Sequence, residues 1–259
     1  MARKKIGLAL SGGGARGFAH IGVLKVLVEH NIPIDMIAGT SAGSIVGGAF
    51  AAGMSVDEII EMASKIGWAT MTRPSLSVLG LLSNAPMGRF LEHHFSVTDF
   101  EACRIPFAAV TCDFDSGDEV VFKGTGELIP AIRASCAVPG VFAPMRDKTD
   151  RLLIDGGVVS PMPTDTVRQM GADIVIAVDL MACGATFRAR PRTAFGMMLQ
   201  STMALLRAAS RNQQYRADII IEPQIAHLRP DEIKKRAEFI SLGEAAARKN
   251  IDAIKGLIE

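Results

Sequence analysis

The chain contains 259 residues, enough for one large α/β domain with a full hydrophobic core or for two small domains. Hydrophobic residues make up 49% of the sequence and charged residues 21%, a balance that excludes an intrinsically disordered protein. The formal net charge is +1, so no overall electric field favours a nucleic acid or another highly charged partner.

The N-terminal stretch and the cysteines predict a cytoplasmic protein. The basic start, Met1–Lys5, is followed by an apolar run that covers only Ile6–Leu10, which is too short for the core of a signal peptide. The four cysteines form no C-x-x-C pair and show no metal-ligand spacing, so we expect free thiols, no metal and no cofactor. The uncharged span 36–54 is interrupted by glycines and hydroxyl residues, which favours a buried strand, turn and helix over a transmembrane segment.

The first predicted strand, Ile6–Leu10, leads into a glycine-rich loop and then a helix that Asn31–Pro33 should end. The loop has two interpretations. Its glycines satisfy G-x-G-x-x-G, and Asp35 lies near the spacing of a ribose-binding acid, although it precedes the second strand instead of ending it. The favoured interpretation is an oxyanion hole, in which the amides of Gly12, Gly13 and Gly14 point at a tetrahedral intermediate.

The second predicted strand ends in Gly39-Thr40-Ser41-Ala42-Gly43, the G-x-S-x-G pattern of a nucleophile elbow. Such an elbow holds a serine on a sharp strand-to-helix turn, where Gly39 and Gly43 leave room for the tight backbone. A helix follows, and its N-terminus favours negative charge developing at Ser41. Strand, loop, helix and strand together predict an α/β fold with a parallel sheet.

The segment between the elbow and the next strands is harder to interpret. An amphipathic helix is expected over residues 55–67. Residues 68–87 are apolar and broken by turn residues, which fits either a mobile lid that meets an oily substrate or a membrane, or an ordinary loop packed over the core. His93 and His94 have no partner at ligand spacing and are expected on the surface or at a helix end.

The rest of the chain predicts alternating strands and helices. A hairpin is expected over residues 107–122, helices over 127–136, 164–170, 194–211 and 237–258, and strands over 152–155, 173–180 and 218–222. Arg188, Arg190 and Arg192 are interpreted as a solvated loop or a contact for phosphate headgroups. The methionine-rich helix 194–211 is interpreted as core or as a subunit contact, which leaves a homo-oligomer open. Without repeats or linkers, a single domain over residues 1–259 is expected.

A serine nucleophile needs a proton acceptor, and the sequence offers no convincing histidine. None of the histidines after Ser41 stands at a strand end beside glycines. The search therefore moves to carboxylates at the C-termini of strands, where open α/β sheets keep their sites. Spacing leaves Asp113, Asp155 and Asp179 as candidates, and the glycine pair after Asp155 favours a close approach there.

These motifs together resemble the patatin-like phospholipases in their small bacterial form. The matching residues are Gly12-Gly13-Gly14-Ala15-Arg16-Gly17, Gly39-Thr40-Ser41-Ala42-Gly43 and Asp155-Gly156-Gly157, with Ala134-Ser135, Pro139 and Phe142 resembling a connecting segment. The resemblance covers about residues 5–179, and three motifs in the right order are more specific than any one of them.

The resemblance implies a three-layer α/β/α fold and hydrolysis of lipid carboxylic esters without metal. It implies Ser41 as nucleophile, Asp155 as the base, and the amides of Gly12, Gly13 and Gly14 as oxyanion donors, with no histidine. Arg16, Gly39, Gly43 and Gly156 are implied to support the site, with the role of Arg16 open between ordering the loop and meeting a phosphate. A lipid substrate also implies peripheral contact with a membrane. The alternatives are a non-catalytic regulatory or membrane-adaptor protein on the same fold, and a dinucleotide-binding protein.

Overall fold

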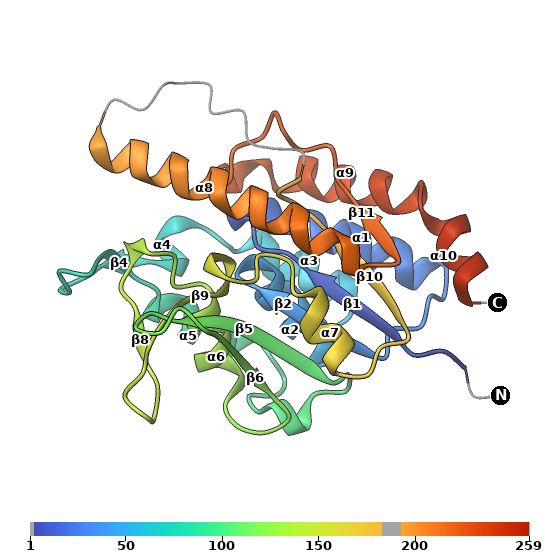
Figure 1. Ribbon diagram of the computed structural model, residues 1–259, viewed down its shortest axis with the longest axis horizontal. Helices are drawn as coiled ribbons and strands as arrows, with labels where there is room; N and C mark the ends of the chain where they lie inside the picture. Colours follow the sequence, from blue (N-terminus) through green and yellow to red (C-terminus); the bar gives the residue numbers. More distant parts are fainter. Residues whose placement is uncertain (1–2, 183–192, 259) are drawn as a thin grey trace.

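The computed structural model of the chain describes residues 3–182 and 193–258. Figure 1 shows a central β-sheet with helices on both faces, and the two chain ends close together at one end of the molecule. The main sheet has the strand order β11–β10–β1–β2–β5–β9–β8, and β6 pairs with β5 off this path. This arrangement confirms the predicted α/β class.

Five strands form the parallel part of the sheet: β11 (Ile219–Ile221), β10 (Ile174–Val178), β1 (Ile6–Leu10), β2 (Met36–Thr40) and β5 (Phe107–Asp113). The remaining strands of this sheet, β6 (Glu119–Lys123), β8 (Met145–Arg146) and β9 (Leu152–Asp155), pair in antiparallel fashion. The sheet is therefore mainly parallel, as predicted, with an antiparallel extension around β5.

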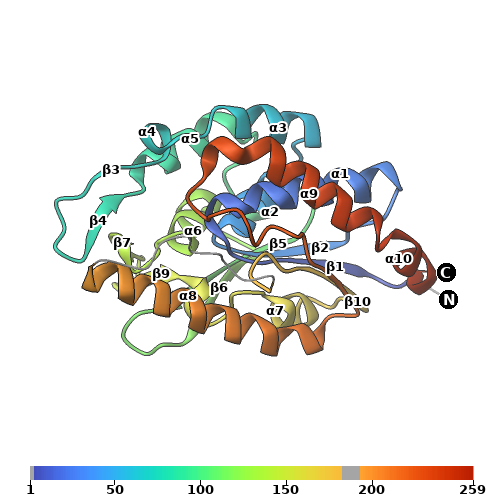
Figure 2. The ribbon, with the colours of Figure 1, turned by 90° about the horizontal axis from the view of Figure 1, so that it is seen from above.

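Helices cover the two faces of the sheet in separate layers (Figure 2). One layer contains α1 (Phe18–Glu29), α2 (Ala42–Ala51), α3 (Val56–Ser64) and α9 (Arg236–Arg248), and the other contains α7 (Thr164–Gln169) and α8 (Ala194–Gln213). The strands alternate accordingly: Leu8 and Leu10 enter the larger core beneath α1, whereas Ala9 faces the smaller core beneath α7. Small side chains on the α7 face let that short helix pack closely.

A three-stranded second sheet lies beside the first and is formed by β3 (Arg73–Pro74), β4 (Gly80–Ser83) and β7 (Gly140–Phe142). The short helix α4 (Trp68–Met71) precedes β3, and α5 (Ala85–His94) follows β4. The segment 68–87 thus consists of α4, an antiparallel hairpin of β3 and β4, and the start of α5. Helix α6 (Leu128–Ser135) precedes β7 in the chain.

Most predicted elements are confirmed, with two corrections. The helix expected over 55–67 is α3, which Ser55 and Glu58 open with a capping box, and His93 and His94 end α5 as expected. The single closing helix expected over 237–258 is wrong, because the chain forms α9 and then α10 (Ile251–Ile258). The arginines at 188, 190 and 192 lie outside the described residues.

The interpretation of the methionine-rich helix as core is also wrong for three of its apolar side chains. Met197, Met198 and Leu205 of α8 are exposed. Helix α8 lies across the outside of the sheet and buries other residues, such as Ser210 near its C-terminus. Among the described residues, no helix is long and apolar enough to cross a membrane.

Gly43 lets α2 approach the first strand so closely that no side chain fits between them. A Cβ atom built on Gly43 would lie 2.2 Å from the carbonyl oxygen of Leu10, and one built on Gly39 would lie 2.4 Å from the carbonyl oxygen of Gly43. Both contacts are with backbone, which cannot rotate away. The glycines of the G-x-S-x-G pattern therefore fix the position of the elbow against the sheet.

We expect Gly43→Ala to lower the free energy of unfolding by about 3 kcal/mol or more, because the backbone of β1 must shift to admit the methyl group. Chemical denaturation measures the loss. Gly256→Ala in α10 is the matched control: its Cβ would meet nothing within 4 Å, so a gain of up to about 1 kcal/mol is expected from helix propensity. If Gly43→Ala were as stable as wild type, that result would contradict the close approach of α2 to β1.

Candidate active site

Ser41 occupies the predicted strand-to-helix turn at the carboxyl edge of the sheet. Strand β2 ends at Thr40 and α2 begins at Ala42, with Ser41 between them at φ 52° and ψ −123°. A positive φ is strained for a residue with a side chain, and such strain persists only where the surroundings hold it. The backbone N–H of Ser41 donates to the Oγ of Ser135 at 2.8 Å, and that hydroxyl donates to the carbonyl of Val110 at 2.6 Å.

We expect Ser135→Ala to reduce kcat by about 10- to 100-fold, because the Ser41 amide loses its partner and the strained turn can relax. The buried unsatisfied amide should also cost about 1–3 kcal/mol of stability. Steady-state kinetics and denaturation give the two numbers. Ser210→Ala is the control: Ser210 is buried and donates to Asp179 at 2.7 Å, so it should lose stability and keep kcat. Equal kcat in Ser135→Ala and wild type would contradict a positioning role.

Asp155 lies at the end of β9, which runs antiparallel to β5 and ends beside the residue of β5 that follows the partner of Thr40. Thr40 of β2 pairs with Val110, and Asp155 of β9 pairs with the next residue, Thr111. Strand β6 pairs with β5 over the same residues, from Ala108 to Cys112, so β2 and β9 must both lie along the other side of β5. Because β2 is parallel and β9 antiparallel to β5, their C-terminal ends meet. The structure thus brings Ser41 and Asp155 together.

The carboxylate of Asp155 is buried and has an oxygen to spare. Its Oδ1 accepts a hydrogen bond from the amide of Gly157 at 2.7 Å. Its Oδ2 is buried and has no hydrogen-bond partner among the described residues. Burial raises the pKa of Asp155 to about 6, while the side chain of Ser41 and the amide of Gly157 act in the opposite direction.

The Ser41 side chain thus influences the pKa of Asp155, although no hydrogen bond of ordinary geometry joins these two described side chains. Gly156 is required at this point, because its Cβ would lie 2.2 Å from the carbonyl oxygen of Val110. The same carbonyl accepts the hydrogen bond from Ser135, so Gly156, Ser135 and Ser41 are held around a single backbone group.

The glycine loop lies directly beside Ser41. A Cβ built on Gly12 would be 3.3 Å from the Cβ of Ser41. The amide of Gly12 donates to the carbonyl of Pro161 at 3.0 Å, so that amide is engaged in this structure. Gly14 has φ 60°, a conformation that favours glycine, and no hydrogen bond from its amide or that of Gly13 to a described residue is recorded. Gly13 and Gly14 are thus the donors that a ligand could use.

Arg16 and His20 hold this loop in place. The guanidinium of Arg16 is buried and donates to the backbone carbonyls of Leu180 and Leu228 at 3.2 and 3.0 Å, so it orders the loop. His20 is also buried, and burial lowers its pKa to about 4. The neutral ring meets the carbonyl of Ser11 at 2.8 Å, where only an N–H can be the donor. Neither side chain is placed to act as the proton acceptor that a serine nucleophile would need.

The other candidate carboxylates make their hydrogen bonds elsewhere. Both oxygens of Asp179 accept hydrogen bonds, from the amides of Met181 and Ala182 and from the side chains of Ser210 and Gln214. Asp113 accepts the amide of Asp115 within the β5–β6 turn. Of the three carboxylates that the sequence left open, Asp155 has the buried free oxygen. Among the described residues, no cluster of side chains suited to a metal ion occurs.

The nucleotide interpretation of the glycine loop finds no support in the position of Asp35. Asp35 precedes β2 and accepts hydrogen bonds from Arg3 and from the amide of Ile6. Since Ile6 begins β1, Asp35 lies at the amino edge of the sheet. A ribose-binding acid must lie at the carboxyl edge with the loop.

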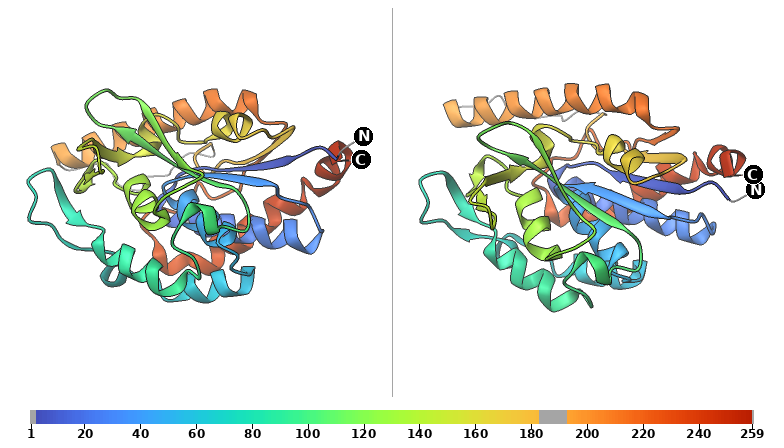
Figure 3. Two further views of the ribbon diagram at one scale, coloured as in Figure 1. Left: turned by 90° about the horizontal axis from the view of Figure 1, so that it is seen from below. Right: turned by 60° about the horizontal axis from the view of Figure 1, so that its bottom comes forward.

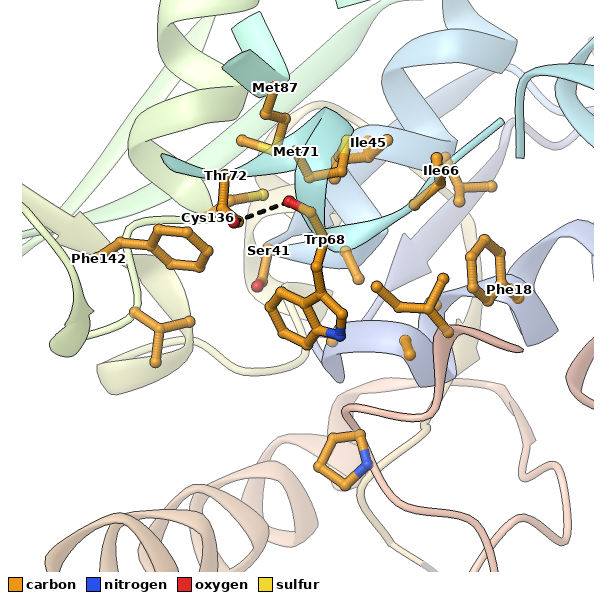
Figure 4. A pocket seen from close by; sticks show the side chains of 18 residues that line it. Phe18, Ser41, Ile45, Ile66, Trp68, Met71, Thr72, Met87, Cys136 and Phe142 are labelled. Atoms are coloured by element: carbon orange, nitrogen blue, oxygen red, sulfur yellow. Dashed lines mark hydrogen bonds between the residues drawn. The ribbon is translucent and has the colours of Figure 1, made fainter. Parts of the chain in front are cut away.

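An apolar pocket opens at Ser41 (Figure 4) and holds about 820 Å³ of empty space, part of it open to solvent. Its walls come from the loop, α1, α2, α4, α5, β7, the segment around Cys136 and residues 230–233. They include Phe18, Ile45, Ile66, Trp68, Met71, Met87, Val138, Phe142, Pro230 and Ile233. Pockets of this apolar character bind small apolar ligands. Ser41 and Thr72 bring hydroxyl groups to this largely apolar lining.

Sequence reasoning missed several of these groups. Pro230 and Ile233 line the pocket, although nothing in their local sequence marks them. The carbonyl of Pro230 also accepts the amide of Ala15 at 2.8 Å, which ties the C-terminal segment to the glycine loop. Ser135 was noted only as part of a resembling segment, and its contact with the Ser41 amide was not foreseen.

Comparisons with known proteins show which family the chain is similar to. The family model of patatin-like phospholipase matches residues 8–168. An uncharacterized NTE family protein of Mycobacterium bovis is 39% identical over 209 residues, which cover 78% of this chain and 57% of that protein. Patatin-like phospholipase domain-containing protein 6 of Mus musculus is 36% identical over 184 residues, 68% of this chain and 13% of that protein.

Among solved structures, VipD from Legionella pneumophila has a similar fold, with a TM-score of 0.64 at 14% identity. The match covers 97% of this chain and 67% of VipD. The chain thus spans a little over half of the mycobacterial relative and a small part of the mouse relative.

Proposed function

The chain belongs to the patatin-like phospholipase family, and from this membership we propose that it is a serine acyl hydrolase that cleaves lipid carboxylic esters through Ser41 and Asp155. The observation that carries the proposal is the buried carboxylate of Asp155, with its free oxygen, beside the strained Ser41 at an apolar pocket. We further propose that residues 1–259 act as one acyl-hydrolase domain.

In the proposed reaction the Oγ of Ser41 attacks the ester carbonyl while its proton passes to Oδ2 of Asp155. The carbonyl oxygen becomes an oxyanion, which the amides of Gly13 and Gly14 and the N-terminus of α2 would stabilise. The intermediate expels the alcohol, which takes the proton from Asp155, and leaves an acyl-enzyme. Water then attacks the acyl carbon with Asp155 again as base, and the fatty acid departs as Ser41 regains its proton.

An aspartate is ordinarily a weak base, and its surroundings must compensate. Burial raises the pKa of Asp155 to about 6, which brings its basicity nearer to that of a histidine. The oxyanion donors are backbone groups of a loop that Arg16 and His20 hold in place, so little reorganisation is needed when charge develops. This chemistry requires no metal or cofactor.

The pocket supports an acyl chain as the group that binds beside Ser41. Its walls are apolar, and a hydrocarbon chain gains free energy from leaving water for such walls. A substrate with long acyl chains resides in a lipid aggregate or bilayer, so we also propose peripheral contact with a membrane.

The test is release of fatty acid by the purified full chain from phospholipids, lysophospholipids and short-chain p-nitrophenyl esters. Turnover of at least one class supports the proposal, whereas a non-catalytic adaptor on the same fold would hydrolyse none. A thermal shift with a dinucleotide, in the absence of any ester turnover, would support nucleotide binding instead.

A further inference from the structure

The hairpin of residues 73–83 presents an unusually apolar tip to solvent. Leu76 and Val78 are fully exposed, and Leu79 and Leu81 are more than half exposed. An exposed patch of neighbouring large apolar side chains is costly in water and marks a contact surface. Figure 1 shows this hairpin, around β4, projecting from the end of the molecule opposite the chain termini.

The hairpin is continuous with the pocket at both of its ends. Before it, Trp68 and Met71 of α4 line the pocket, and after it Met87 of α5 does so. Strand β4 also pairs with β7, where Leu82 is opposite Phe142, another pocket residue. Trp68 is half exposed, so its indole belongs both to the pocket lining and to the outer surface.

A second exposed apolar element points to the same end of the molecule. Both views of Figure 3 show the N-terminal end of α8 and the tip of the hairpin on one side, away from the termini. Met197 and Met198 lie in the first turn and a half of α8 and are exposed. The hairpin tip (Leu76, Val78, Leu79, Leu81) and these two methionines form what we call the apolar end.

The charges around the apolar end favour an anionic partner. From Ile66 to Leu91 the sequence contains two arginines, Arg73 and Arg89, and no acidic residue. Arg73 lies at the base of the hairpin, opposite Ser83, and both arginines are exposed. The part of α8 that carries Met197 and Met198, residues 194–206, contains no aspartate or glutamate, and the arginines of α8 lie farther along the helix. Apolar side chains flanked by arginines without acids fit the boundary of an anionic bilayer.

We propose that the apolar end inserts its hairpin tip and the methionines of α8 into the surface of an anionic lipid bilayer, so that an acyl chain can pass along Trp68 into the pocket at Ser41. This inference rests on the proposed acyl-ester hydrolysis, for which it names the surface that presents the substrate. The bilayer replaces water around the exposed leucines, and the arginines at the hairpin base meet the headgroup phosphates.

The test measures binding of the full chain to sedimented vesicles of phosphatidylcholine alone and of phosphatidylcholine mixed with phosphatidylglycerol. Leu76→Ser combined with Val78→Ser should weaken binding on the order of a hundredfold, because two apolar side chains that would insert into the bilayer are lost. Arg73→Gln should reduce the preference for the anionic vesicles roughly fivefold. The matched control replaces exposed apolar residues away from the apolar end, Val28→Ser with Tyr215→Ser, and should bind like wild type.

Hydrolysis of a soluble short-chain ester separates this inference from the proposed function. The hairpin variant should keep that turnover, which also shows that it is folded, and lose hydrolysis of vesicle lipids. Ser41→Ala should bind vesicles like wild type without any turnover. If no protein hydrolyses esters but wild type still binds vesicles through the hairpin, the proposed function fails and the membrane surface stands.

Two outcomes would overturn the membrane surface. One is equal vesicle binding by wild type and the hairpin variant. The other is found by light scattering: wild type is a dimer, and the hairpin substitutions convert it to a monomer without changing vesicle binding. The apolar end would then be a contact between two copies of the chain.

Discussion

Replacing Ser41 with alanine is expected to lower kcat/KM for ester hydrolysis roughly a million-fold, to the level of background. The first bond of the proposed reaction forms at the Ser41 hydroxyl, and without it no acyl-enzyme can form for water to hydrolyse. Stability should stay within about 0.5 kcal/mol of wild type, because alanine keeps the Cβ and the backbone amide that Ser135 holds. Esterase assays and chemical denaturation on the same preparations give both values.

Ser160→Ala is the matched control for this substitution. Ser160 is a buried serine near the same edge of the sheet, and its hydroxyl accepts a hydrogen bond from Gln213 at 3.3 Å. This variant should retain turnover. Undiminished hydrolysis by purified Ser41→Ala would remove Ser41 from the mechanism.

The second large effect is expected from Asp155→Asn. An amide cannot accept the proton from Ser41, so kcat should fall about 10,000-fold, as for other catalytic carboxylates that support a serine nucleophile. The amide oxygen can still accept the hydrogen bond from Gly157, which should preserve the local structure. Asp113→Asn is the control, because it removes a carboxylate from a strand end at the same edge without touching Ser41. Wild-type kcat in Asp155→Asn would exclude Asp155 as the base.

The raised pKa of Asp155 predicts how activity depends on pH. The base must be unprotonated, so kcat/KM of wild type should be constant above pH 6 and fall tenfold per pH unit below the pKa of about 6. If kcat/KM stays constant down to about pH 4 and falls only below it, the carboxylate of Asp155 is not desolvated in the working enzyme.

The raised pKa of Asp155 also predicts that the folded protein loses stability as the pH rises, whereas activity increases over the same range. The pKa of Asp155 is higher in the folded protein, about 6, than its ordinary value of 3.8. The folded state therefore binds the proton more tightly, and this contribution to stability is complete below pH 3.8 and lost as the pH rises through 6. Relative to Asp155→Asn, wild type should lose about 3 kcal/mol between these limits. Denaturation of both proteins across the pH range measures the difference.

The elements around Ser41 could be predicted because their signals are local. An apolar run, a glycine-rich loop and the G-x-S-x-G pattern each occupy a few consecutive residues, and the structure places them as β1, the loop and the turn between β2 and α2. The glycines at 39 and 43 are explained by backbone atoms 2.2–2.4 Å from where their side chains would be. Patterns of this kind depend on chain stereochemistry and need no tertiary context.

The choice of Asp155 needed information that local sequence does not contain. Asp113, Asp155 and Asp179 all end strands, and only the pairing along β5 decides which of them meets Ser41. That pairing is antiparallel for β9, and nothing in the local sequence around Asp155 specifies the direction of this strand. The resemblance to a family supplied the choice that the residues alone left open.

The pocket and the apolar end depend on long-range packing and were the least predictable. Pro230 and Ile233 approach Ser41 from almost two hundred residues away. The methionine-rich helix was interpreted as core or as a subunit contact, but α8 crosses the outside of the sheet and leaves Met197 and Met198 exposed. Segment 68–87 contains a hairpin with an exposed tip, and residues on either side of the hairpin line the pocket, an arrangement that local sequence alone could not specify.

The most direct test of the central claim is covalent labelling with a fluorophosphonate, followed by mass spectrometry of the digested protein. The claim is that Ser41 is activated by the buried carboxylate of Asp155. We expect one adduct, on the peptide that contains Ser41, formed rapidly in wild type, much more slowly in Asp155→Asn and not at all in Ser41→Ala. An adduct on a different residue, or labelling of Asp155→Asn at the wild-type rate, would contradict the account.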